Sequence, residues 1–123
     1  MPIHVRTVGQ VQIVELTGDF TIGGSTLGRP LDLKGRPLDD LGVVLTDLFD
    51  RGQLRIILDL RHVTFIDSAG LGELVASKKR ALERGGDIKI LQPAKRVREL
   101  LVMTLLTRVF EIHEDEAKAI GSF

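Results

Sequence analysis

Three side-chain types that often carry chemistry are missing from this sequence, because its 123 residues include no cysteine, no tryptophan and no tyrosine. The absence of cysteine excludes disulfide bonds, thiolate metal sites and cysteine nucleophiles. Aromatic residues are limited to five phenylalanines, so the stacking platforms that hold single-stranded nucleic acid are poorly supported.

A net charge is missing as well, since 17 lysines and arginines balance 17 aspartates and glutamates. A neutral chain has no overall field to draw it toward phosphate-rich partners, so we expect no direct binding to nucleic acid. No apolar run is long enough to span a bilayer. The first residues also lack the charged start and apolar stretch of a secretory signal. We therefore expect a soluble, cytoplasmic protein that is not inserted into a membrane.

What the sequence does contain is an alternation of strand and helix patterns over a length suited to one domain. Residues 3–8 and 11–16 alternate apolar and polar side chains around a turn, which is typical of a hairpin. Helix and strand patterns then alternate, and their expected ranges are 37–52, 56–60, 68–84, 87–93, 94–104, 109–112 and 114–120. This order favours an α/β fold in which parallel strands follow an antiparallel opening.

Residues that recur at helical spacing indicate one face of each longer helix. These residues are Leu38, Leu41, Leu45, Leu48 and Phe49 on the first helix, Leu71, Leu74, Val75, Lys78 and Leu82 on the second, and Val97, Leu100, Leu101 and Thr104 on the third. Before the first helix, residues 21–37 are rich in glycine and proline. That composition predicts an extended loop with weak order.

Ser68 stands where the central strand gives way to the second helix, so we expect it to be exposed. A helix start offers unpaired N–H groups and a positive dipole end, which would tolerate a negative group there. Its apolar neighbours, suitable for docking, are Phe65, Ile66, Ala69 and Leu71. Phosphorylation would add about 1.5 to 2 negative charges and could repel a bound partner. Alternatively Ser68 only caps the helix, a role that Asp67 could also take, and spacing does not separate the two.

Enzymatic roles for Ser68 find little support. The hydrolase elbow has glycine two residues before and two residues after its nucleophile. Gly70 satisfies the second position, but Ile66 occupies the first. The histidines are His4, His113 and His62, the last expected on a loop before Ser68. Such residues are more often polar surface groups than catalytic bases, so we expect the protein not to be an enzyme.

Cofactor and metal sites are also poorly supported. Gly70 and Gly72 beside a helix start resemble a glycine-assisted anion site, but their spacing matches neither a P-loop nor a dinucleotide fingerprint. Glycine at such a place more often permits close packing or a tight turn. Asp59 and Asp67 lack a histidine at ligand spacing. We therefore expect no cofactor and no metal.

Basic residues gather on the second and third helices. They are Lys78, Lys79, Arg80, Arg84, Lys95, Arg96 and Arg98. We interpret them as solvated helix faces, partly offset by nearby glutamates, rather than as a patch for nucleic acid.

Residues 57–74, ILDLRHVTFIDSAGLGEL, closely resemble the signature of the sulfate transporter and anti-sigma factor antagonist (STAS) domain. The distinctive part is the run from Asp67 to Leu71, DSAGL, after a hydrophobic strand that ends in Asp59 and Leu60. The similarity continues in VQIVELTGDFTIG, KKRALERGGDIKILQPAKRVRELL and VFEIHEDEAKAIGSF, so it covers nearly the whole chain, residues 1–123.

The resemblance implies a mixed sheet, opened by an antiparallel hairpin, with helices packed mainly on one face. It also implies a bacterial anti-sigma factor antagonist of the sporulation and stress type, which is a substrate and ligand rather than a catalyst. The unmodified form would bind an anti-sigma factor that is also a serine kinase, releasing the sigma factor. Phosphorylation of Ser68 would end that binding, and a serine phosphatase would restore it.

By the same resemblance, Asp67 would shape the turn, Gly70 and Leu71 would present the helix start to the partner, and Asp19 would lie nearby. With Phe65, Ser68 and Ala69 these residues make up the expected partner-binding set. Residues 21–37 look like an insertion relative to the family, and they could alter the choice of partner. The alternative is an accessory subunit of a membrane system that transports lipids or anions, in which Ser68 is only a helix cap.

Overall fold

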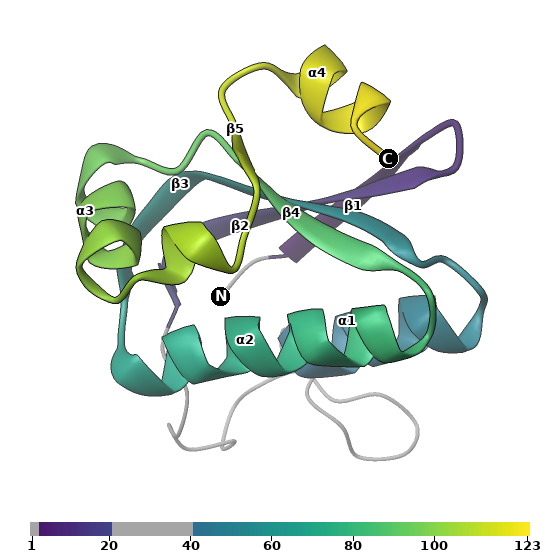
Figure 1. The fold of residues 1–123 in the computed structure, drawn as a ribbon, viewed down its shortest axis with the longest axis horizontal. Helices are drawn as coiled ribbons and strands as arrows, with labels where there is room; N and C mark the ends of the chain where they lie inside the picture. Colours follow the sequence, from purple (N-terminus) through teal and green to yellow (C-terminus); the bar gives the residue numbers. More distant parts are fainter. Residues whose placement is uncertain (1–2, 21–40) are drawn as a thin grey trace.

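The structure, a computed structural model, describes residues 3–20 and 41–123. Its elements follow the order β1 (Ile3–Val8), β2 (Val11–Phe20), α1 (Leu41–Asp50), β3 (Arg55–Ile66), α2 (Ser68–Glu83), β4 (Asp87–Leu91), α3 (Lys95–Met103), the short helix η1 (Leu106–Arg108), β5 (Ile112–His113) and α4 (Glu116–Gly121) (Figure 1). The predicted strand and helix order is confirmed for these residues. The glycine- and proline-rich stretch 21–37, the expected insertion, lies outside the described residues, as does Leu38.

One mixed sheet of five strands, in the order β1-β2-β3-β4-β5, organises the described residues. β1 and β2 form the predicted antiparallel hairpin, with Val8 opposite Val11. The pairs β2–β3, β3–β4 and β4–β5 are all parallel. The carboxyl ends of β2 and β3 therefore meet at one edge of the sheet, where the second helix begins.

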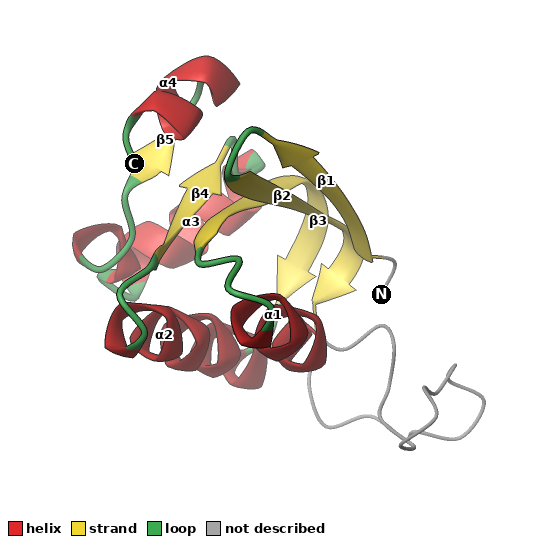
Figure 2. Ribbon diagram, turned by 90° about the vertical axis from the view of Figure 1, so that its right-hand side faces the viewer, coloured by secondary structure: helices red, strands yellow, loops and turns green. Residues whose placement is uncertain are grey.

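Different helices pack against the two faces of the sheet (Figure 2). Apolar side chains of α1, α2 and α3 share one core with the strands, for example Leu45, Leu74 and Leu101. The opposite face packs against α4 through a smaller cluster that includes Ile57 and Ala119. Alternation along each strand explains this division, because successive side chains point to opposite faces. Helices packed mainly on one face, as expected, are thus confirmed.

β3 is longer than predicted, since it runs to Ile66 rather than ending near residue 60. Beyond Leu60, only Val63 and Ile66 of this strand are buried. The continuous apolar run has ended there, but the pairing with β2 continues. His62 lies within this strand, opposite Thr17, so its expected position on a loop is wrong.

The last strand also begins later than residue 109. The main-chain N–H groups of Val109 and Phe110 donate to the carbonyl of Leu106, at 3.0 and 2.9 Å. These bonds commit the backbone to a helical turn, so β5 forms only at Ile112–His113.

α2 buries a different face from the one that its larger residues indicate. Its buried residues are Gly70, Leu74, Ser77 and Ala81, whereas Leu82 and Val75 are 53% and 38% exposed. Small side chains let the helix lie close to the sheet, and this closeness is not encoded in hydrophobicity. On α3, Val97 and Leu101 are buried as indicated, but Thr104 is the exposed residue that caps its end.

Candidate functional site

The site is built where the carboxyl ends of β2 and β3 meet the start of α2. In the register of the two strands, Asp19 lies opposite Phe65 and Phe20 lies opposite Ile66. The Thr64 hydroxyl donates to Oδ1 of Asp19 at 2.6 Å. One residue further on, the N–H of Asp67 donates to the carbonyl of Phe20 at 3.2 Å. These contacts bring the predicted Asp19 beside the Ser68 turn.

Asp67, not Ser68, caps α2. Oδ1 of Asp67 accepts a hydrogen bond from the N–H of Gly70 at 2.6 Å, and the Asp67 backbone is extended, with φ −83° and ψ 174°. A carboxylate at this position also complements the positive end of the helix. The two capping alternatives that spacing left open are thereby decided in favour of Asp67.

Ser68 is the first residue of α2, and its side chain is exposed. Within residues 3–20 and 41–123 its hydroxyl takes part in no hydrogen bond. An unengaged hydroxyl at a helix start can be approached and modified without breaking a contact of the fold. The added charge would also face the backbone N–H groups of the first turn.

Gly70 holds the turn against β2 because no larger residue fits there. A Cβ at this position would lie 2.7 Å from the carbonyl oxygen of Phe20, 3.0 Å from Cγ2 of Ile66 and 3.1 Å from Oδ1 of Asp67. The expectation that glycine permits close packing here is confirmed. Gly72 meets nothing within 4 Å, so the same reason does not apply to it.

The remaining members of the expected partner-binding set differ in exposure. Ala69 is exposed and Phe65 is 37% exposed, so both are available to a partner. Leu71 is half-buried and packs against the main core, and Gly70 is buried. These two residues can position the turn, while the solvent-facing part of the set consists of Asp19, Phe65, Ser68 and Ala69.

Arg96, which the sequence analysis interprets as part of a solvated helix face, is a neighbour of the site. Its guanidinium carbon lies 5.7 Å from the centre of the Phe65 ring, a cation–π distance. The residue belongs to the first turn of α3, so this contact links α3 to the end of β3. Sequence spacing could not reveal this contact, because it depends on how α3 packs against the end of β3.

Most of the other basic residues on α2 and α3 have acidic partners. Lys78 pairs with Asp87 at 2.8 Å, and Arg80 and Arg84 pair with Glu73 and Asp50, both at 2.9 Å. Arg98 forms an ion pair with Glu114. This pairing agrees with solvated helix faces rather than a continuous cationic patch.

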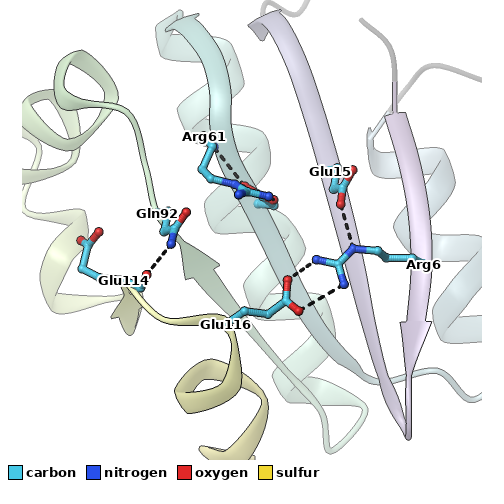
Figure 3. Close-up of polar contacts among 7 residues, drawn as sticks. Arg6, Glu15, Arg61, Gln92, Glu114 and Glu116 are labelled. Carbon is cyan, nitrogen blue, oxygen red and sulfur yellow. Dashed lines mark hydrogen bonds and ion pairs between the residues drawn. The ribbon is translucent and has the colours of Figure 1, made fainter.

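A separate charged cluster lies on the sheet face that α4 partly covers (Figure 3). Arg6 pairs with Glu116 of α4 and also donates to Glu15 at 2.8 Å, and these hydrogen bonds raise the pKa of Arg6. Buried Asp59 accepts three hydrogen bonds from the Arg61 side chain, which likewise raise the pKa of Arg61. The contacts tie α4 to the sheet and give Asp59 a structural partner.

Two of the three histidines lie beside carboxylates of neighbouring strands or loops. His113 bonds to Glu111 at 2.6 Å, and His4 faces Glu15 across the hairpin. No group of three or more metal-binding side chains comes together among residues 3–20 and 41–123. Across these same residues, no helix is both long enough and apolar enough to span a bilayer.

Comparison with proteins of known structure shows where this fold recurs. The crystal structure of an anti-sigma factor antagonist from Mycobacterium paratuberculosis aligns with a TM-score of 0.73 and 17% identity, covering 98% of this chain and 92% of that one. The Bacillus cell fate determinant SpoIIAA in its phosphorylated form aligns with a TM-score of 0.65 and 17% identity, covering 98% of each chain. At these identities the likeness shows a shared fold.

Sequence comparison shows the family. The anti-sigma F factor antagonist of Paenibacillus polymyxa is 31% identical over 65 residues, which are 53% of this chain and 56% of that protein. The chain thus matches little more than half the length of this relative. Residues 43–119 match the STAS domain. Since this match covers more than half of the sequence, the chain belongs to the STAS domain family.

Proposed function

We propose that this protein is an anti-sigma factor antagonist switched by phosphorylation of Ser68. The unmodified form binds an anti-sigma factor that is also a serine kinase, and the sigma factor is released. Phosphorylated Ser68 ends this binding, and a serine phosphatase restores it. In this cycle the protein is a ligand and a substrate rather than an enzyme.

The observation that carries the proposal is the division of roles at the start of α2. Asp67 caps the helix through the Gly70 N–H, and this leaves the exposed Ser68 hydroxyl outside the hydrogen bonds of the described fold. The family supports the same role, since the Paenibacillus relative is an anti-sigma F factor antagonist and the Bacillus neighbour has been solved in a phosphorylated form.

Electrostatics explains how a phosphate could reverse binding without unfolding the chain. The N-terminal N–H groups of α2 favour a negative group at Ser68. A partner docked on Phe65 and Ala69 would instead meet about 1.5 to 2 added negative charges beside the carboxylates of Asp19 and Asp67. The modification therefore acts mainly on the complex and little on the fold.

The test is phosphorylation by anti-sigma factor kinases of the same organism with ATP, followed by peptide mapping. We expect phosphate on Ser68 and none on Ser77, which lies on the same helix but is fully buried. A kinase that modifies the chain should also bind Ser68→Ala as it binds the wild type, whereas Ser68→Asp should weaken binding. Absence of phosphate on Ser68, or equal affinities of the Asp and Ala variants in calorimetry, would contradict the proposal.

A further inference from the structure

We propose that the partner contacts a second surface, the outer face of α3, and that Arg96 pairs there with a carboxylate of the partner. This α3 face consists of Arg96, Leu100 and Met103, together with Phe65 at its end. The proposal rests on the proposed function, because its occupant is the anti-sigma factor kinase that binds the Ser68 turn.

Continuity with the Ser68 turn is the first argument. Phe65 stands three residues before Ser68, opposite Asp19, and its 37% exposed ring carries the Arg96 guanidinium at 5.7 Å. α3 lies at the same end of the molecule as the start of α2 (Figure 1). A protein surface wide enough to cover Ser68 and Phe65 would therefore also reach the first turn of α3.

The charge of Arg96 is the second argument. In the described part of the chain no carboxylate forms an ion pair with it, whereas Arg98 on the same helix pairs with Glu114. The Phe65 ring holds the guanidinium in place but leaves its N–H donors available. A guanidinium group is planar and always charged, so it can bind a carboxylate through two parallel hydrogen bonds.

The local sequence of α3 supports a role in binding rather than in folding. Its first turn has no acidic residue, its capping position is Ala94 without a side-chain hydrogen bond, and Lys95 and Arg96 stand at the positive end of the helix. Cations at that end oppose the helix dipole, so helix stability does not explain them. Residues that do not favour the secondary structure in which they stand are expected on surfaces that serve a function.

Exposed apolar atoms complete the surface. Met103 is 79% exposed, more than any other large apolar side chain of the described residues. It follows Arg96 by seven residues and half-buried Leu100 by three, so the three share one helical face. An unbranched, polarizable methionine adapts to the shape of a partner. The partner surface that fits combines an apolar side chain over Met103 with a carboxylate over Arg96.

The experiment measures the affinity of charge-reversal variants for the kinase that modifies Ser68. We expect Arg96→Glu to weaken binding at least about tenfold, because a favourable charge pair becomes a repulsive one. Lys79→Glu is the matched control, since Lys79 is exposed on α2 and forms no ion pair within residues 3–20 and 41–123. Its effect should stay within about twofold. Arg96→Lys should recover part of the affinity by keeping the charge.

A second pair of variants tests the apolar part of the surface. Met103→Asp should weaken binding, whereas Leu82→Asp, at a 53% exposed position on α2, should not. Thermal unfolding of all variants must stay close to that of the wild type, so that lost binding is not lost folding.

The outcomes separate the two proposals. If the wild type binds and Ser68→Asp weakens binding, but Arg96→Glu binds no more weakly than Lys79→Glu, the α3 surface is refuted and the Ser68 switch stands. If no anti-sigma factor kinase of the organism binds or modifies the wild type, the proposed function fails and the α3 surface with it. Weak binding by Arg96→Glu and Met103→Asp, beside normal binding by their controls, supports the surface.

Discussion

Replacing Gly70 with alanine should destabilise the protein even though alanine is the better helix former. The added Cβ would lie 2.7 Å from the Phe20 carbonyl oxygen, a backbone atom that cannot move without disturbing β2. Overpacking of this kind costs about 1 to 3 kcal/mol, while the helix preference of alanine over glycine returns at most about 1 kcal/mol. With the full helix preference subtracted, the net expectation is a loss of up to about 2 kcal/mol in the free energy of unfolding.

Gly72 is the matched control on the same helix. A Cβ there meets nothing within 4 Å, so Gly72→Ala should gain about 0.5 to 1 kcal/mol from helix preference and reduced chain entropy. The two substitutions are chemically identical and should differ in sign. Urea unfolding followed by far-ultraviolet circular dichroism is the suitable assay, because the chain has neither tryptophan nor tyrosine to report by fluorescence. An unfolding free energy that rises in both variants would refute the close approach of α2 to Phe20.

Three further predictions concern the cap, the proposed phosphorylation site and a charged contact. Asp67→Ala should lower the free energy of unfolding by about 1 kcal/mol through loss of the helix cap. Ser68→Ala should change it by no more than about 0.5 kcal/mol. Equal losses for the two variants in urea unfolding would contradict the assignment of the cap to Asp67. Ser68→Asp should leave stability unchanged or raise it by about 0.3 to 1 kcal/mol at low salt, and a clear drop in thermal midpoint would show that the hydroxyl does support the fold. Hydrogen bonds from Lys89 and, to a smaller extent, His113 hold the pKa of Glu111 below its ordinary value of 4.5. The ionised carboxylate therefore stabilises the fold above pH 4.5, and this stabilisation is lost as the pH falls through the lowered pKa. The stability gap between wild type and Glu111→Gln should therefore shrink as the pH falls below about 4.5. A gap that stays the same in that range would exclude this contact as its cause.

The fold could be predicted from sequence wherever one local signal dominates. The hairpin turn, the apolar run of β3 and the glycines after α2 each mark an element whose existence the structure confirms. The errors fall where pairing or packing overrides local pattern. β3 continues to Ile66 because β2 remains its partner after the apolar run ends, and α2 buries Ser77 and Ala81 because small residues fit against the sheet.

The candidate site was partly predictable for a similar reason. Asp67, Ser68 and Gly70 are consecutive or nearly so, and helix-start chemistry links them within one turn. The place of Asp19 came from resemblance, and the structure supplies its physical basis in the parallel register that sets it opposite Phe65. Arg96 had no such local signal, since its contact with Phe65 depends on the position of α3 relative to the end of β3.

The separation of the cap from the Ser68 hydroxyl would make the proposed binding switch compatible with a stable fold. Had Ser68 itself capped α2, phosphorylation would have removed a bond of the helix start and linked the modification to unfolding. Because Asp67 supplies that bond, a phosphate on Ser68 can add charge while α2 keeps its cap. Gly70 then keeps the turn close to Phe20, so the charge would appear at a fixed place relative to Phe65 and Arg96. A partner that needs both the turn and the α3 face would lose the first contact on phosphorylation and keep only the second.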